Sequence, residues 1–381
     1  MRRGTSIIFF FLVLLPLSVC GQMLLQGRIV DADTGEPLPY AVISSSSHRT
    51  LSNRDGNFSL YAMDSEMLTV SFVGFEKKRF IANKLPAIIY LMPQTIEMQE
   101  VIVKALPTQE ILRHIRKKIH REWLTRSMKR TLYFFRTTIE NADHTNEMME
   151  GFYDARSAIN IRNPIIVSGQ TRIDGRAEKN EIKKTNFQHL FSLAPTIYDI
   201  PFWKSTLQPL GNLEGVEKAY ETSIFPFFDA EGKKNYKIEF LFNGLAPKDW
   251  EGRILIQGTL YVDAQTYGML HFDGQLLGMR QVLDDIRMGM NLNFHIQFTH
   301  ERGFTEVSHI SFDGGNKILS YHCLLFKVDK YKEKSQTCEL RNLVTGIKGA
   351  GYEPSMWDKY DIVRRTEAEE QIARKNNTQE P

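Results

Sequence analysis

The sequence predicts a mainly β protein in which one amphipathic helix connects two β units. Three observations lead to this prediction. Short apolar runs separated by turn residues fill the segment from Leu24 to Pro93. Apolar residues then recur at helical spacing between Thr108 and Met128. From Leu132 onward, strand patterns follow one another with short turns, which favours a large antiparallel sheet over a parallel sheet with crossover helices.

The first residues have the pattern of an export signal. Two arginines precede an apolar run at 7–19, which is about the length of a signal-peptide core and too short to span a bilayer. We expect cleavage before Gln22, so that residues 1–21 are a signal peptide. The alternative is lipidation of Cys20, although Val19 stands where lipidated cysteines usually follow a small residue. The mature protein is therefore expected in the periplasm or at the outer membrane, without a membrane-spanning segment.

The charge balance gives no reason to expect a nucleic-acid partner. The chain has 48 lysines and arginines, of which 46 remain without the two in the signal, against 45 acidic residues. A net charge near zero supplies no general attraction to a polyanion.

Residues 22–93 have the strand and turn signals of a β-sandwich. Asp55-Gly56 is a strong hairpin signal, and Asp33-Thr34-Gly35 marks an earlier turn. The expected strands are 27–30, 40–44, 58–61, 68–72 and 88–91.

Three runs in this segment resemble the carboxypeptidase regulatory-like domain. They are GRIVDADTGEPLPYAVI at 27–43, SNRDGNFSL at 52–60 and LTVSFVGFEKK at 68–78. That domain is common at the N-termini of outer-membrane proteins of Bacteroidetes. The resemblance implies a seven-stranded, immunoglobulin-like or transthyretin-like sandwich. It implies no peptidase activity, because the family takes its name from an accessory domain beside an enzyme.

Residues 94–130 are expected to form a linker strand and a basic amphipathic helix. Glu100-Val101-Ile102-Val103 resembles a stretch that follows the sandwich in TonB-dependent nutrient receptors with this domain. In the helix at 108–130, an apolar stripe lies opposite many lysines and arginines. Such a helix can make peripheral contact with anionic lipid or pack its stripe on its own domain. We favour the second interpretation.

Residues 131–363 are expected to form an antiparallel β domain. The run GTLYVDAQTYGMLHFDG at 258–274 weakly resembles the curved sheet of periplasmic lipoprotein carriers. Residues 364–381 are expected to contain a C-terminal helix and a disordered tail, since Thr366 and Glu369 have capping-box spacing. The expected strands are 132–140, 148–159, 237–243, 253–263, 268–274, 288–299, 306–312 and 321–328.

An apolar segment at 186–210 interrupts these strands with helical or irregular structure. Its aromatic residues either cover an apolar cavity in the curved sheet as a lid or complete an ordinary core. The candidate lid residues are Phe187, Phe191, Phe202 and Trp203. Cys323 and Cys338 would lie opposite each other in a hairpin, so they either form a disulfide or remain two buried thiols.

No catalytic, cofactor-binding or metal-binding motif is recognisable. His144 and Glu147 have the spacing of zinc carboxypeptidase ligands, but a metal site needs at least a third ligand. We therefore expect a non-catalytic envelope protein that binds a protein partner or an apolar ligand. A lipid or lipoprotein carrier is the first alternative. A hydrolase without a short signature is the second.

Overall fold

The computed structural model describes residues 22–94, 108–126, 131–141, 144–155, 165–173, 206–207, 219–229, 231–245, 254–277, 292–298, 305–313, 319–330, 357 and 362–376. Several predicted features lie outside these residues. They are the signal peptide with Cys20, the linker strand at 100–103, the lid candidates Phe187, Phe191, Phe202 and Trp203, and Cys338.

The N-terminal unit is a seven-stranded β-sandwich, which confirms the predicted fold class. Its first sheet has the order β4-β1-β7 and its second the order β3-β2-β5-β6. β1 pairs in parallel with β7 and antiparallel with β4. The strands are β1 (Met23–Asp31), β2 (Val42–Ser44), β3 (Arg49–Leu51), β4 (Asn57–Ala62), β5 (Met67–Ser71), β6 (Lys78–Ile81) and β7 (Ile88–Leu91), with a 3-10 turn η1 at Ala82–Lys84.

Alternating apolar residues of both sheets fill the centre of the sandwich. Phe58, Ile29, Ile43 and Val70 are fully buried there. Burial of side chains of this size contributes about 1.5–3 kcal/mol each, so the sandwich has a core of its own.

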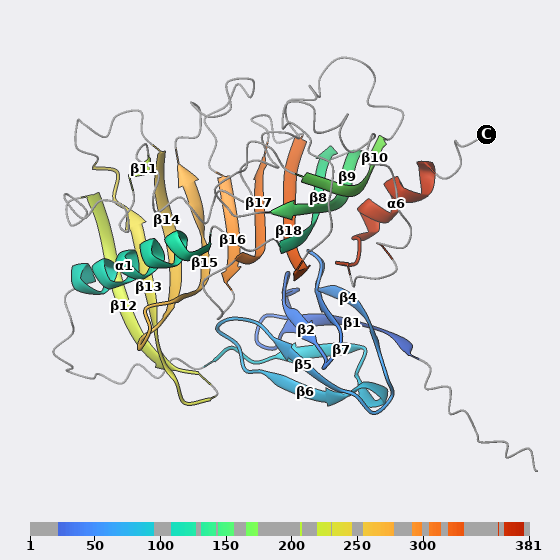
Figure 1. Ribbon diagram of the computed structural model, residues 1–381, viewed down its shortest axis with the longest axis horizontal. Coiled ribbons are helices and arrows are strands. Elements are labelled where there is room, and N and C mark those ends of the chain that lie inside the picture. Colours follow the sequence, from blue (N-terminus) through green and yellow to red (C-terminus); the bar gives the residue numbers. More distant parts are fainter. Residues whose placement is uncertain are drawn as a thin grey trace, which may run out of the picture.

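The C-terminal unit is one large sheet. Its order is β10-β9-β8-β18-β17-β16-β15-β14-β13-β12, and the short β11 pairs in parallel with β14. The antiparallel arrangement confirms the prediction. Sequence neighbours pair throughout this path except where β8 lies against the final strand β18 (Figure 1). The strands are β8 (Thr131–Asn141), β9 (His144–Ala155), β10 (Ile165–Ile173), β11 (Thr206–Leu207), β12 (Tyr220–Phe228), β13 (Lys234–Phe242), β14 (Ile254–Asp263), β15 (Met269–Leu277), β16 (Leu292–Phe298), β17 (Thr305–Asp313) and β18 (Leu319–Lys330).

One face of this sheet is apolar and buried. Phe240, Phe272 and Phe294 form a continuous aromatic stack across β13, β15 and β16, with ring centroids 5.6 and 4.9 Å apart. Because side chains alternate along a strand, the residues between them point to the opposite face. That opposite face is polar at its centre and carries the site described below.

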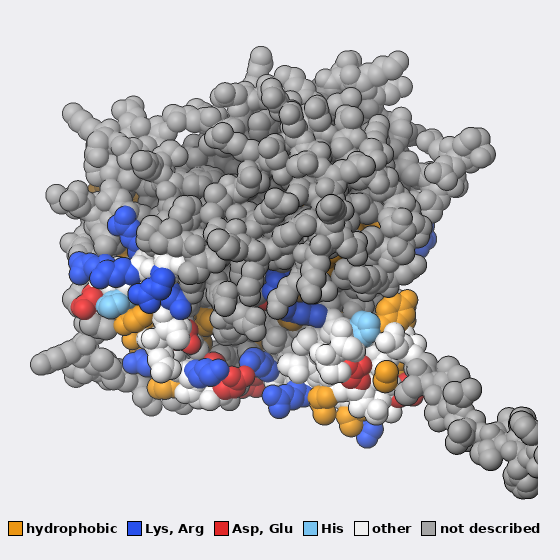
Figure 2. All heavy atoms as spheres, in the orientation of Figure 1, with side chains coloured by type: hydrophobic (Ala, Val, Ile, Leu, Met, Phe, Trp, Pro, Cys, Tyr) orange, Lys and Arg blue, Asp and Glu red, His pale blue; other side chains and the backbone are white. Residues whose placement is uncertain are grey.

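Helix α1 (Thr108–Arg126) lies beside β12 and the turn between β14 and β15. Ile111, Leu112 and Ile115 are buried, and the His114 ring stacks on Tyr267 at 4.6 Å. Four basic residues of α1, Arg113, Arg116, Lys117 and Arg121, are exposed, and basic side chains gather on this part of the surface (Figure 2). The described part of the apolar stripe therefore packs on the protein, while contact of the basic face with lipid stays a prediction.

The sandwich lies against the sheet, and the two units share a core (Figure 1). Tyr40 and Leu51 from the sandwich pack with Phe134, Phe152 and Phe326 from the sheet. Because this core is continuous across both units, their relative position is fixed by packing.

Helix α6 (Glu367–Asn376) starts at the capping box that the sequence predicts. The Glu369 backbone N–H donates to Thr366 Oγ1 at 3.2 Å, and the Thr366 N–H donates to Glu369 Oε2 at 2.8 Å. This reciprocal pair satisfies two amide groups that the helix leaves without partners.

Candidate functional site

A row of side chains crosses the polar face of the sheet beneath the sandwich. Its members lie directly opposite one another on eight successive strands, from β13 to β9. This polar row comprises Glu239, Thr259, Asp273, His295, His309, Leu324, Arg136 and Glu150. Side chains of directly opposed residues contact one another, so the row brings charged and titratable groups together.

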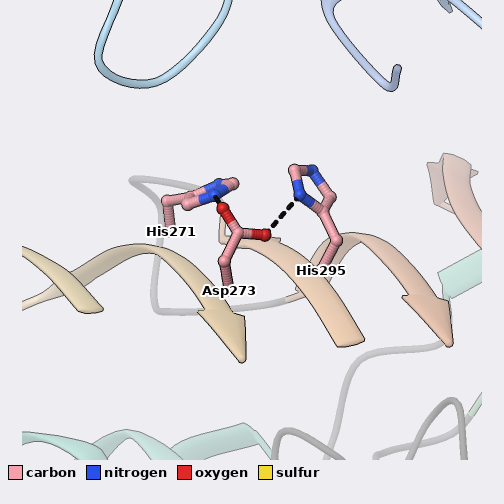
Figure 3. A group of neighbouring side chains, drawn as sticks. All are labelled: His271, Asp273 and His295. Atoms are coloured by element: carbon pink, nitrogen blue, oxygen red, sulfur yellow. Dashed lines mark hydrogen bonds and ion pairs between the residues drawn. The ribbon is translucent and has the colours of Figure 1, made fainter. Parts of the chain in front are cut away.

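His271, Asp273 and His295 form a compact cluster near the centre of this face. Asp273 lies between the two rings, and both rings point a nitrogen at its carboxylate (Figure 3). His271 Nε2 donates to Asp273 Oδ2, and His295 Nδ1 donates to Oδ1 at 2.7 Å. Since an ionised carboxylate only accepts, each of these nitrogens carries the hydrogen.

Gln297 fixes the protonation of His295 at its other nitrogen. Gln297 Nε2 lies 3.0 Å from the Tyr40 carbonyl oxygen and 3.1 Å from His295 Nε2. The amide group donates one hydrogen to each, so His295 Nε2 accepts. The ring is thus neutral, with its hydrogen on Nδ1.

Burial and charge in the cluster act in opposite directions. Partial loss of solvation favours the neutral acid of Asp273, but His271 and His295 outweigh this effect and hold the pKa of the carboxyl well below its usual range. Burial lowers the pKa of His295, and Asp273 opposes this only in part. The Asp273 side chain is 49% exposed and that of His271 only 2%, so the carboxylate is the accessible group.

Aromatic side chains of the sandwich cover the histidines. Phe72 stacks on His295 with a centroid distance of 5.9 Å and an interplanar angle of 4°. The Tyr40 ring lies 5.4 Å from His295 and 4.7 Å from His309. The cluster is therefore completed by residues from both units.

A buried ion network continues the row toward α6. Glu150, which is fully buried, pairs with Arg136 at 3.0 Å and with Arg365. Although burial opposes ionisation, the two guanidinium groups lower the pKa of Glu150 to about 2. Arg54 of the sandwich joins the network through Glu140 and Glu369.

A cleft of about 510 Å³ opens beside the cluster, between the sandwich and the sheet. One wall is the outer face of β2 and β5, and the other is formed by the ends of β12, β13, β15 and β16. Aromatic surface in this cleft comes from Phe72, Phe75, Phe227 and Phe298. Gln297 also lines the cleft, and its side chain contacts His295 of the cluster. The volume lies within the range of small-molecule sites.

Two ion pairs join the walls of this cleft. Lys77 Nζ lies 2.7 Å from Glu231 Oε1, with both side chains about half exposed. Arg49 pairs with the more buried Glu306. Both pairs run from the sandwich to the sheet, so the walls are held at a defined separation.

The structure describes some of the site residues that the sequence predicts, but not all of them. The Cys323 side chain is buried beside Thr137, and burial raises the pKa of its thiol to about 12. Because Cys338 lies outside the described residues, the disulfide stays a prediction. His144 and Glu147 are among the first residues of strand β9, which begins at His144.

Sequence reasoning missed the cluster of His271, Asp273 and His295. The available signal was polar residues at alternate positions of two predicted strands, His271 and Asp273 in one and His295 in the next. A period of two places such residues on one face. Only the register of β15 against β16 shows that they meet.

Comparisons with known proteins support the N-terminal assignment. Residues 25–103 match the family model of the CarboxypepD_reg-like domain, which confirms the resemblance seen in the sequence. A search of curated proteins found no match. Among the described residues, no helix is long and apolar enough to cross a membrane.

One solved structure is similar to part of this chain. It is described as an outer membrane lipoprotein-sorting protein domain from Vibrio parahaemolyticus, with 10% identity over 60% of this chain and 96% of that one. The TM-score is 0.20, which carries no argument about the architecture or activity of this chain.

Proposed function

We propose that this protein is a non-catalytic binding protein of the cell envelope whose ligand occupies the cleft between the sandwich and the sheet. The observation that carries the proposal is the cleft itself, which combines about 510 Å³ of volume with walls from both units. Ligand sites occur preferentially at such junctions, where apolar walls carry a few placed polar groups.

The chemistry of the walls supports a ligand with both apolar and polar parts. Four phenylalanines offer surface for apolar or aromatic groups, while Arg49 and Lys77 place cationic heads among them. Each of these cations is also paired with a carboxylate of the sheet. A ligand with an anionic group would compete with those carboxylates for the cations.

The shared core and the ion network support a preformed site. Tyr40 and Leu51 are buried against the sheet, and Arg54 reaches carboxylates of β8 and α6. A cleft whose walls are fixed in this way binds without the cost of ordering a loop.

A non-catalytic role agrees with the hydrogen bonding of the cluster. Within the described residues, His271 and His295 both donate to Asp273, and His295 Nε2 is occupied by Gln297. Among the residues that the structure describes, neither imidazole is hydrogen-bonded to a hydroxyl or thiol that it could activate as a nucleophile.

The test is native mass spectrometry of protein released gently from the envelope. Ser71 lines the cleft, so Ser71→Trp would fill it. Ser59→Trp is the matched control, since Ser59 lies on β4, in the other sheet of the sandwich. We expect a bound mass on the wild type and on Ser59→Trp, and its loss from Ser71→Trp.

Two results would contradict the proposal. One is a wild-type protein without any bound mass. The other is a bound mass that Ser71→Trp retains in full. If that retained mass is a lipid, the carrier interpretation replaces the present one.

A further inference from the structure

We propose that His271, Asp273 and His295 form a binding site for a divalent transition-metal ion of the zinc class. This inference goes beyond the proposed function, because it assigns a site outside the lining of the cleft. The three side chains offer two imidazole nitrogens and one carboxylate oxygen, and these atoms all lie within 4.8 Å of one another.

The donor set fits such an ion. Imidazole suits zinc and its neighbours in the first transition row, while magnesium and calcium prefer oxygen donors. Three protein ligands with one position left for water are typical of zinc sites that are not purely structural. Water could reach a bound ion from the side of Asp273, which is half exposed, since the two histidines are nearly buried.

The His295 and Asp273 ligand atoms are a small adjustment away from the spacing of a tetrahedral site. Ligand atoms about 2.1 Å from zinc are about 3.4 Å apart at tetrahedral angles. The present separation of His295 Nδ1 and Asp273 Oδ1 is 2.7 Å, so the carboxylate would withdraw by less than the length of a bond. The half-exposed aspartate has room for this movement, and the strand positions of the histidines can remain as they are.

The strands hold these ligands rigidly. His271 and Asp273 are alternate residues of β15, and His295 lies directly opposite Asp273 on β16. Phe72 packs flat on the His295 ring and edge-on to His271. Ligands fixed by sheet register and by packing lose little freedom when they bind an ion.

Metal binding would replace the two hydrogens that the rings now share with Asp273. His295 would then carry its hydrogen on Nε2, facing Gln297. The Gln297 amide would have to turn so that Oε1 accepts this hydrogen, and its bond to the Tyr40 carbonyl would be lost. Metal binding would thus break the hydrogen bond between Gln297 and the Tyr40 carbonyl. In its place, Gln297 would accept a hydrogen bond from His295, as the partners that orient metal-bound histidines do.

Equilibrium dialysis with zinc chloride tests this site directly. The full mature chain is first stripped with a chelator, and bound zinc is measured at pH 7.5 in the presence of excess magnesium. Asp273→Asn removes the charged ligand while preserving its shape. His48→Gln is the control for surface histidine binding, because His48 lies in the turn between β2 and β3, with Gln22 as its hydrogen-bond partner.

We expect one zinc ion per wild-type chain and per His48→Gln chain, and an affinity at least about 100-fold lower for Asp273→Asn. Substoichiometric zinc on the wild type, or equal binding by Asp273→Asn, would overturn the proposal. Cobalt(II) gives a second measurement on the wild type alone, which needs no variant to fold. An intense tetrahedral visible spectrum supports the site, and the weak spectrum of the hydrated ion contradicts it.

Discussion

Removal of the Glu150 charge should destabilise the protein more than removal of the charge of an exposed carboxylate. Glu150 is fully buried between Arg136 and Arg365. Glu150→Gln keeps the size of the side chain and removes its charge, so Arg136 and Arg365 lose the buried carboxylate that they share. Loss of one partner of a buried ion pair typically costs about 3–5 kcal/mol.

The pKa of Glu150 gives an independent magnitude. It falls from 4.5 to about 2, and a tenfold change in acidity corresponds to about 1.36 kcal/mol, so the charge contributes about 3 kcal/mol to folding. Because the pKa is lower in the folded state, this stabilisation is complete above pH 4.5. It is lost as the pH falls from 4.5 toward 2.

Urea unfolding at pH 7 and pH 3 measures both the stability lost in Glu150→Gln and the dependence of that loss on pH. We expect the free energy of unfolding of Glu150→Gln to lie about 3 kcal/mol below that of the wild type at pH 7, and about 1 kcal/mol below it at pH 3. Glu231→Gln is the exposed control and should cost less than about 1 kcal/mol. A pH 7 difference below about 1 kcal/mol, or one that does not shrink on acidification, would refute the reasoning.

Three further predictions concern single residues, each checked by thermal or urea unfolding. Gly56 has a φ of +78°, and an added Cβ would lie 2.4 Å from the Ile29 carbonyl oxygen. Gly35 has a similar φ of +74°, but an added Cβ would meet no atom there. Gly56→Ala should therefore cost about 1–3 kcal/mol more stability than Gly35→Ala, and equal costs would contradict this. Thr366→Ala should cost about 1 kcal/mol, because it removes the capping hydroxyl of α6, and an unchanged stability would show that the cap is dispensable. Burial is the main reason that the pKa of His309 lies well below its usual range, and His322 and Arg54 add to it. The stabilising effect of the neutral ring is therefore complete above pH 6.5 and declines below it. His309→Gln should lose less stability than the wild type between pH 7 and pH 5, and equal losses would exclude this histidine as the cause.

Local signals predicted much of the fold. Asp55-Gly56 forms the turn between β3 and β4, where the Gly56 N–H donates to the Asn53 carbonyl oxygen. The spacing of Thr366 and Glu369 predicted a cap that the hydrogen bonds reproduce. These features depend on residues within a few positions of one another, which is the range over which sequence patterns are informative.

Pairings between distant segments could not be predicted in the same way. β8 lies against β18, about 190 residues later, and nothing in either strand specifies that partner. The polar row depends on the register of seven strand pairs, and a one-residue shift in any pair would turn its side chains to the other face. The cluster of His271, Asp273 and His295 therefore became visible only with the structure.

The contact between the two units could not be predicted from the sequence either. Tyr40 and Leu51 read as sandwich residues, yet both are buried against the sheet. An apolar residue at a strand end gives no indication of which unit covers it. The cleft, which depends on that docking, has no signature in the sequence.

Zero-length cross-linking with a carbodiimide tests most directly whether the sandwich is seated on the sheet so that it closes the cleft. Lys77 Nζ lies 2.7 Å from Glu231 Oε1 across the two units, and Lys233 Nζ lies 3.1 Å from the other oxygen of the same carboxylate within its own turn. We predict that peptide mass spectrometry finds amide products of Glu231 with both lysines. Formation of the local Lys233 product alone would contradict the docked arrangement and, with it, the proposed binding site.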